Sequence, residues 1–200
     1  IKAIAAAKAA KVPLQVGFNR RWDQAFAEGR AAIDAGKVGT PQLIRSLTRD
    51  PGPFGADPAK VPHWTIFYET LIHDFDTLLW LNPGARPVEV YAAADALVRP
   101  NSRSKGFLDT AVVTIRFANG SVAVAEANFS ALYGYDIRGE VFGSGGMVTM
   151  GDVRRSSMTI FDAEGVSNDT WRRDTDHFIH GYTAQLASFV RTIRSGDISG

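Results

Sequence analysis

The sequence has no cysteine among its 200 residues, which excludes disulfide bonds and thiolate metal sites. This composition fits a reducing compartment, and we expect a cytoplasmic protein. No apolar run approaches the roughly 20 residues that a membrane-spanning helix needs. We therefore expect no association with a membrane.

Neither sign of charge predominates, because 22 Lys and Arg residues stand against 21 Asp and Glu residues, for a net charge of +1. Adjacent arginines are scattered and are not interleaved with aromatic side chains; they occur at Arg20-Arg21, Arg154-Arg155 and Arg172-Arg173. Nucleic acids and anionic membrane surfaces bind clustered basic patches. The sequence therefore predicts no nucleic-acid partner.

Three common motifs of catalysis and nucleotide binding are missing. The sequence contains no G-x-x-x-x-G-K-[ST] phosphate loop and no G-x-S-x-G nucleophile motif. The glycine-rich run at residues 143–146 does not fit G-x-G-x-x-G, and it joins two predicted strands instead of opening a helix. We interpret that run as a turn, and no residue is assigned to binding a dinucleotide.

Helix and strand patterns alternate in the first 81 residues. Alanine and lysine predict a helix over residues 2–11, and the apolar residues 14–18 predict a short buried strand directly after it. Further helices are predicted over 23–35 and 65–81, with a strand at 42–48 and a proline- and glycine-rich loop at 50–63. A helix that leads directly into an apolar strand is half of an alternating α/β pattern.

From residue 87 onward the pattern changes to strands joined by short turns. Strands are predicted at residues 88–94, 110–117, 121–128, 136–142, 147–150 and 157–161, and a last helix at 176–194. Asn119-Gly120 is a strong signal for a two-residue hairpin turn. Successive strands with short connections favour an antiparallel sheet. The fold class predicted is α+β, with an open, mostly antiparallel sheet flanked by helices.

The predicted helix at 65–81 holds the strongest candidate for catalysis. Glu69 and His73 stand at positions i and i+4, with Asp76 three residues further, so the three side chains share one face. Imidazole titrates near neutral pH, and a neighbouring carboxylate can orient it as a proton acceptor. Such a pair can remove a proton from a hydroxyl while a hydride leaves the same carbon. The spacing equally fits an exposed Glu–His pair on a helix surface.

The histidines also allow a metal-site interpretation. His63, His73 and Asp76 offer nitrogen and oxygen ligands, and His177 and His180 stand at i and i+3 on the last predicted helix. These spacings match no established metal motif, so we expect no bound metal.

Asp76 and four further polar residues are candidates for substrate binding. Asn19 and Arg20 directly follow the strand predicted at 14–18, and the carboxyl ends of strands border the ligand crevice in α/β sheets. Tyr133 and Tyr135 flank a glycine between two predicted strands, where their hydroxyls can reach a ligand. A plain strand-to-helix loop for the first pair, and packing for the tyrosines, remain the alternatives.

Several segments, taken in order, resemble the Gfo/Idh/MocA family of oxidoreductases, which includes glucose–fructose oxidoreductase and inositol 2-dehydrogenase. The resemblance spans nearly the whole chain and is closest to inositol 2-dehydrogenase. It rests on residues 12–23 (VPLQVGFNRRWD), 36–39 (GKVG), 72–76 (IHDFD), 134–136 (GYD), 140–143 (EVFG) and the last predicted helix. The ordered set is much more specific than any one of these motifs.

The resemblance implies a nicotinamide-dependent enzyme with two domains. Residues 1–20 would be the last helix and strand of a truncated Rossmann domain, and residues 21–200 the substrate-binding and oligomerisation domain. The family's glycine-rich cofactor loop and its Glu-Lys-Pro motif would lie before Ile1. We therefore expect NAD or NADP as cofactor, a homodimer or homotetramer formed through the sheet, and no activity from the 200 residues alone.

The resemblance also implies roles for individual residues. His73 matches the family's catalytic histidine, and Glu69 stands where the inositol-type enzymes carry Asp. Asn19 and Arg20 would border the substrate or the nicotinamide, with Tyr135 at the pocket wall. The expected reaction is oxidation of a CH–OH group of a cyclic polyol or sugar. Two alternatives stay open: a non-catalytic dimerisation or regulatory module of the same fold, and a metal-dependent isomerase or hydrolase.

Overall fold

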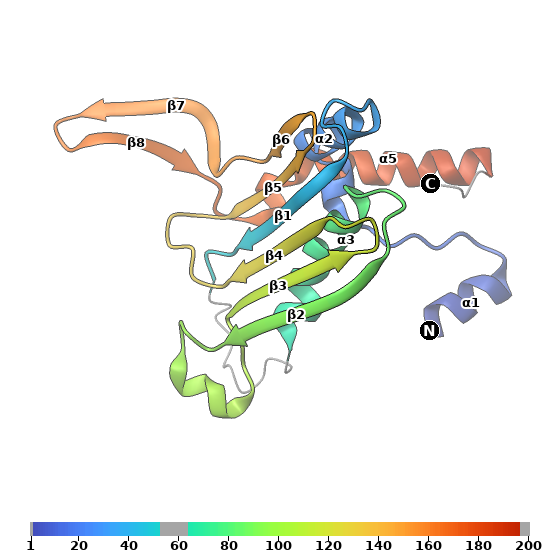
Figure 1. Ribbon diagram of the computed structural model, residues 1–200, viewed down its shortest axis with the longest axis horizontal. Coiled ribbons are helices and arrows are strands. Elements are labelled where there is room, and N and C mark those ends of the chain that lie inside the picture. Colours follow the sequence, from blue (N-terminus) through green and yellow to red (C-terminus); the bar gives the residue numbers. More distant parts are fainter. Residues whose placement is uncertain (1, 53–63, 197–200) are drawn as a thin grey trace.

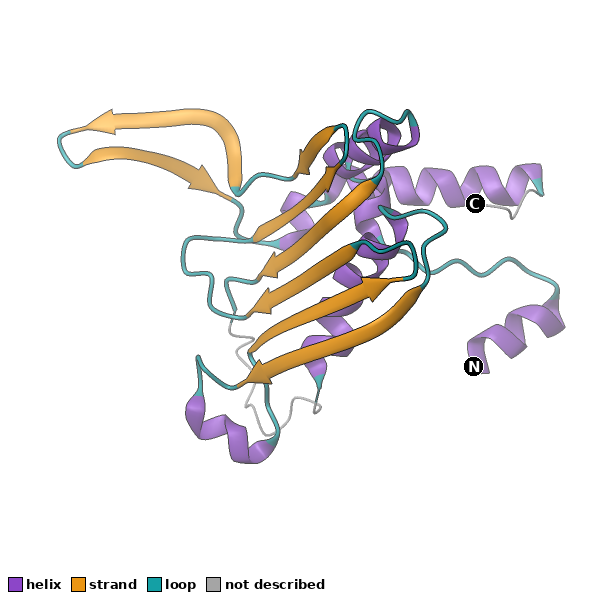
Figure 2. Ribbon diagram, in the orientation of Figure 1, coloured by secondary structure: helices purple, strands orange, loops and turns teal. Residues whose placement is uncertain are grey.

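The computed structural model describes residues 2–52 and 64–196 and centres on an open six-stranded sheet. Its strands are β1 (Pro41–Arg49), β2 (Pro87–Asp95), β3 (Thr110–Phe117), β4 (Val122–Asn128), β5 (Asp136–Gly143) and β6 (Gly146–Met150). Helices lie behind one face of the sheet and leave the other face uncovered (Figures 1 and 2). The predicted α+β class, with a mostly antiparallel open sheet and flanking helices, is confirmed.

The strand order is β2-β3-β4-β1-β5-β6. Among the described strands, β1 and β4 pair in parallel and all other neighbours of this sheet pair antiparallel. The hairpin between β3 and β4 turns at the predicted Asn119-Gly120, where Gly120 has a φ of 87° that favours glycine. Because β1 lies between β4 and β5, its C-terminal end is at a central position of the sheet.

Alternation along the strands separates a core face from an open face. In β3 and β4 the odd-numbered residues, among them Val113 and Ala125, are buried, while their even-numbered neighbours point to the open face. Phe26 of α2 (Gln24–Asp34) and Leu78 of α3 (Ile72–Trp80) are fully buried in the same core. Each such side chain contributes roughly 1.5–3 kcal/mol by leaving water. Packing of α3 on the sheet therefore fixes the position of His73.

The helix predicted at 65–81 is present but begins as a π-helix, η3 (Ile66–Leu71), before it continues as α3. Short π segments inside helices widen one turn and are frequent at functional sites. Glu69 and Thr70 lie in this wide turn and His73 lies just after it. The predicted loop over 50–63 falls largely on residues 53–63, and these, with His63, lie outside the described residues.

The strand predicted at 14–18 is wrong. The helix before it is present as α1 (Lys2–Ala10), but residues 12–18 take no strand or helix conformation. Leu14 and Val16 are 54% and 69% exposed, because no described strand lies beside them to pair with their backbone. The apolar residues alone predicted this strand, but no described strand pairs with it.

Three regions from residue 100 onward differ from the prediction. The strand predicted at 157–161 is part of β7 (Arg154–Asp162), which forms a separate hairpin with the unpredicted β8 (Gly165–Thr170). Figure 1 shows this hairpin reaching away from the main sheet. A short helix, η4 (Pro100–Lys105), was also not predicted. The last helix is divided at the buried Phe178 into α4 (Asp174–His177) and α5 (Ile179–Ser195). None of the described helices is long and apolar enough to cross a bilayer.

Candidate active site

A cavity of about 260 Å³ opens where α3, α5, the end of β1 and the short helix η1 (Asn19–Trp22) meet. The structure brings five of the predicted site residues to this cavity: Asn19, Arg20, Glu69, His73 and Tyr135. It adds polar residues that the sequence did not single out, among them Thr48, Asp50, Thr70, Asp174 and Tyr182. Its volume suits one small ring with its substituents and is too small for a dinucleotide.

His73 is half-buried at the first turn of α3. Its Nδ1 atom is buried without a hydrogen-bond partner among the described residues, and its ring lies edge-on to Phe18, with centroids 6.0 Å apart. Burial lowers the pKa of His73 below its ordinary value of 6.5, and the Arg20 charge lowers it further, while nearby carboxylates act in the opposite sense. His73 is therefore neutral at neutral pH and able to accept a proton.

Glu69 lines the same cavity from the π segment, but its side chain is exposed. Among the described contacts, no hydrogen bond joins Glu69 to His73. The carboxylates that act on the pKa of His73 belong to Asp74, Asp76 and Asp174. The role of Glu69 as the partner of His73 stays a prediction.

Arg20 forms a buried ionic network beneath the cavity. Its guanidinium donates to Asp74 Oδ1 at 2.6 Å and to Ser46 Oγ at 2.9 Å, and it also donates to Thr48 Oγ1. Asp74 is fully buried and accepts from both hydroxyls as well. The network joins η1, β1 and α3. Much of the hydrogen-bonding capacity of Arg20 is thus used within the protein, although the side chain still lines the cavity.

A second chain of hydrogen bonds forms part of the cavity wall. The Asn19 amide donates to the Tyr182 hydroxyl at 3.1 Å, and that hydroxyl donates to Asp174 at 3.5 Å. Tyr135 lies in the same cavity, where burial and then the Asp50 charge raise the pKa of its hydroxyl. Tyr135 therefore stays protonated and can donate a hydrogen bond.

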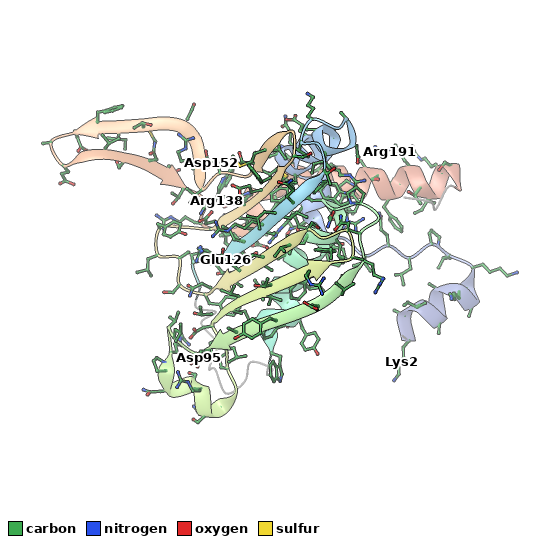
Figure 3. The ribbon with its side chains drawn as sticks, viewed as in Figure 1. Lys2, Asp95, Glu126, Arg138, Asp152 and Arg191 are labelled. Carbon is green, nitrogen blue, oxygen red and sulfur yellow. The ribbon has the colours of Figure 1, made fainter. Side chains whose placement is uncertain are left out.

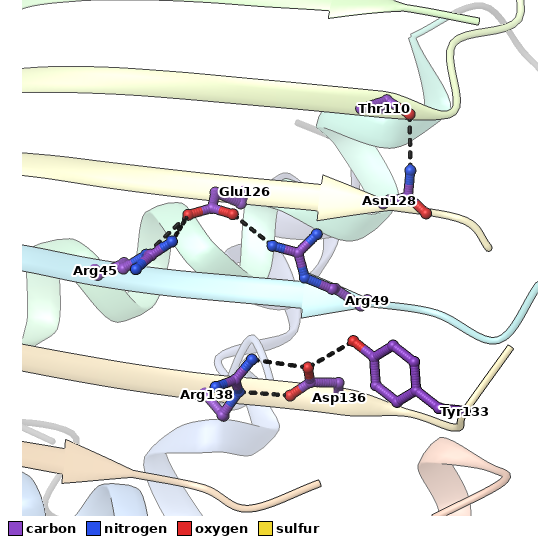
Figure 4. Close-up of polar contacts among 8 residues, drawn as sticks. All are labelled: Arg45, Arg49, Thr110, Glu126, Asn128, Tyr133, Asp136 and Arg138. Carbon is purple, nitrogen blue, oxygen red and sulfur yellow. Dashed lines mark hydrogen bonds and ion pairs between the residues drawn. The ribbon is translucent and has the colours of Figure 1, made fainter. Parts of the chain in front are cut away.

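The structure does not bring Asp76 or Tyr133 to the cavity. The Asp76 carboxylate is paired with both Nε and Nη2 of Arg21, at 2.9 and 2.7 Å. The hydroxyl of Tyr133 donates to Asp136 at 2.8 Å at the edge of the open face, as Figure 4 shows. Gly134, at a φ of 135°, turns the chain between the two tyrosines, so only Tyr135 lines the cavity. Asp76 had been predicted in the site from helical spacing and Tyr133 from its position near Tyr135, and the structure places neither there.

A metal site is not assembled by the described residues, since no three His, Asp or Glu side chains gather closely enough among residues 2–52 and 64–196. His177 lies between the rings of Trp171 and Phe178, with centroids 5.1 and 4.6 Å away. Burial lowers the pKa of His177, as expected for a packed, neutral ring. His63, another of the proposed ligands, lies outside the described residues.

Comparison with known protein families shows to which family the chain belongs. The sequence profile of the GFO/IDH/MocA C-terminal domain matches residues 26–149, more than half of the chain. The chain belongs to the Gfo/Idh/MocA family. The predicted resemblance is thereby confirmed, and the six-stranded sheet with its two packed helices is the C-terminal domain of a Gfo/Idh/MocA protein.

Curated relatives include a named inositol dehydrogenase and an uncharacterized oxidoreductase. The chain is 36% identical over 194 residues to myo-inositol 2-dehydrogenase of Thermotoga maritima, covering 95% of the chain and 57% of that protein. It is 39% identical over 168 residues to the uncharacterized oxidoreductase YrbE of Bacillus subtilis, covering 84% of the chain and 49% of that protein. The chain thus spans about half the length of the curated relatives it matches.

A solved structure with ligands shares the Gfo/Idh/MocA fold. The scyllo-inositol dehydrogenase of Lactobacillus casei, with bound NAD(H) and scyllo-inositol, superposes with a TM-score of 0.89 at 26% identity. The superposition covers 97% of this chain and 58% of that one. A probable dehydrogenase from Thermotoga maritima gives a TM-score of 0.88 at 34% identity over 98% of this chain and 59% of its own.

Proposed function

We propose that this chain is the substrate-binding and catalytic part of an NAD-dependent oxidoreductase that oxidises a CH–OH group of a cyclic polyol such as inositol. The observation that carries the proposal is His73, a neutral imidazole that lines a cavity sized for one ring. Relatives named inositol dehydrogenases support the choice of a cyclic polyol. Neither the dimerisation module nor the metal-dependent enzyme is favoured by these comparisons.

The chemistry assigned to the chain's own residues is proton transfer and orientation. His73 accepts the proton of the substrate hydroxyl, because its lowered pKa leaves the imidazole unprotonated at neutral pH. Tyr135 and Asn19 contact other hydroxyls of the ring and hold the reacting carbon in place. A bound NAD would supply the acceptor for the hydride that leaves that carbon.

The cofactor proposal applies to the whole protein. The cavity at His73 fits a ring-sized substrate and does not accommodate a dinucleotide. We propose that residues 1–20 are the end of a Rossmann domain and that residues 21–200 form the substrate domain. Exposed apolar side chains at residues 12–16 and a helix α1 without buried residues support that division. We propose NAD as cofactor on the strength of the relatives' names, and a cytoplasmic location from the lack of cysteine.

The proposed function is tested by following reduction of NAD with myo-inositol and scyllo-inositol in the natural full-length protein. We expect turnover with at least one inositol and much less with an open-chain polyol of equal carbon number. Equal rates with ring and open-chain polyols would contradict the choice of substrate class.

The lowered pKa of His73 predicts how the rate depends on pH. A base must be unprotonated to act, so kcat/KM should fall as the pH is lowered through the pKa of His73 and level off at neutral pH. Because burial and Arg20 lower that pKa, the inflection should lie below 6.5. An inflection above 6.5, measured from initial rates over a pH series, would show that another group controls the rate.

We also propose that the protein is a homodimer or homotetramer formed through the open face of the sheet. None of the helices that the structure describes covers this face (Figure 2). Leu43, Phe142 and Met147 form a row across β1, β5 and β6 on this face and are 44%, 47% and 56% exposed. Ion pairs border the row: Glu126 binds Arg45 and Arg49, and Asp136 binds Arg138 (Figure 4). Figure 3 labels Glu126 and Arg138 on the sheet. Exposed apolar area beside ordered charge is typical of a protein interface.

Replacing Phe142 by glutamate is expected to lower the molar mass in solution toward that of a single chain. Each copy would place a carboxylate in the apolar row, where burial without a partner is costly. Light scattering after gel filtration measures the mass. Val90→Glu is the control, since Val90 is 64% exposed but points to the other face of the sheet. An unchanged mass for Phe142→Glu would contradict this interface.

A further inference from the structure

Three side chains from separate elements form one wall of the cavity that holds His73. Asn19 comes from η1, Asp174 begins α4 and Tyr182 lies in α5. None of them is close to His73 in sequence, and the proposed proton transfer does not use Asp174 or Tyr182 to accept the proton. Their common position in the cavity calls for a separate role.

The direction of the hydrogen bonds in this wall is fixed by chemistry. The Asn19 amide nitrogen can only donate, so the Tyr182 oxygen accepts that bond at 3.1 Å. The single proton of Tyr182 is then directed to Asp174 Oδ2 at 3.5 Å. Among the described residues, Asp174 Oδ1 receives no hydrogen bond. The wall therefore ends in a held carboxylate with free capacity to accept.

Carboxylates outnumber permanent cations among the described residues that line the cavity. Among the described residues that line it, Asp50, Glu69 and Asp174 carry carboxylates, and Arg20 is the one permanent cation. The Arg20 charge is balanced by the buried Asp74, 2.6 Å away. Within the part of the cavity that the described residues form, an anionic ligand would thus meet carboxylates without a free cation to offset them.

We propose that Asp174, held by Tyr182 and Asn19, determines which class of substrate the site accepts. The carboxylate accepts a hydrogen bond from a hydroxyl on a ring carbon other than the one oxidised. An uncharged ring polyol binds, a polyol with a protonated amino group at that carbon binds at least as well, and one carrying phosphate or carboxylate is rejected. This inference rests on the proposed function and names its substrate class.

The test compares three substrates in the natural full-length protein with NAD: myo-inositol, an amino-deoxy-inositol and an inositol monophosphate. The unmodified protein should show kcat/KM for the phosphate lower than that for myo-inositol by about tenfold or more. Asp174→Asn should raise KM for myo-inositol about tenfold, with kcat within about threefold, because the contact is made equally in the ground and transition states. In the same variant, the difference in kcat/KM between myo-inositol and the inositol monophosphate should become smaller.

Two further variants keep the result interpretable. Asp176→Asn is the matched control, because Asp176 is exposed, pairs with Arg173 and does not line the cavity. Tyr182→Phe removes the hydroxyl that holds Asp174 and should raise KM in the same direction by a smaller factor, and it serves as the test if Asp174→Asn does not fold. Turnover of myo-inositol with unchanged KM in both cavity variants, or equal kcat/KM for the phosphate, would overturn this inference alone. No turnover of any ring polyol by the unmodified protein would overturn the proposed function with it.

Discussion

Replacing His73 by alanine is expected to lower kcat for polyol oxidation by about 10²- to 10⁴-fold, the usual contribution of a positioned general base. The reason is that His73 lines the cavity and its lowered pKa leaves the imidazole neutral, with one ring nitrogen able to accept a proton. Affinity for NAD should stay close to that of the unmodified protein, since the lost group acts on the substrate hydroxyl. Initial rates and a fluorescence titration of the cofactor measure the two quantities.

His180→Ala is the control for this experiment, because His180 is exposed on α5 and does not line the cavity. Its kcat should equal that of the unmodified protein. If His73→Ala retained more than about half of kcat, His73 would not be the base, and Tyr135 or Glu69 would have to be tested in its place.

Replacing Asp74 by alanine is expected to lower the free energy of unfolding by about 3–5 kcal/mol. The substitution leaves the guanidinium of Arg20, which is only 3% exposed, buried without its countercharge. It also removes the acceptor of Ser46 and Thr48. Urea unfolding followed by circular dichroism gives the value.

The exposed pair of Arg30 and Asp34 provides the comparison for the buried one. Asp34 is 51% exposed, so Asp34→Ala should change stability by at most about 1 kcal/mol. Replacing both members of the buried pair with apolar residues, Arg20→Met with Asp74→Leu, should recover much of the loss, because no unpaired charge remains. Equal losses for Asp34→Ala and Asp74→Ala would show that the buried network contributes little to the fold.

Much of the sheet could be predicted because its residues alternate in the sequence itself. In β3 and β4 every second residue is apolar and buried, and Asn119-Gly120 marks the turn between them. His73 could be proposed for a similar local reason, since helical spacing placed it beside Glu69. The structure places both residues at the cavity, although it does not join them by a hydrogen bond.

The remainder of the site depends on contacts between distant residues that no local pattern shows. Asp174 and Tyr182 are more than 100 residues from His73 and reach the cavity only because α5 packs against η1. Asp74 lies next to His73 in sequence, yet only the fold shows that it is buried against Arg20. The π segment, which holds Glu69, departs from the regular helical spacing that the sequence suggested. Asp76 pairs with Arg21, a contact that the sequence did not show.

The most direct test of the central claim uses myo-inositol with deuterium on its ring carbons, incubated with NAD and the natural full-length protein. Mass spectrometry then measures the deuterium content of the NADH formed. Transfer of hydride from a CH–OH carbon predicts that each NADH carries a deuterium atom, and that His73→Ala forms labelled NADH at a much lower rate. Unlabelled NADH, or deuterium released to water without any NADH, would contradict the account.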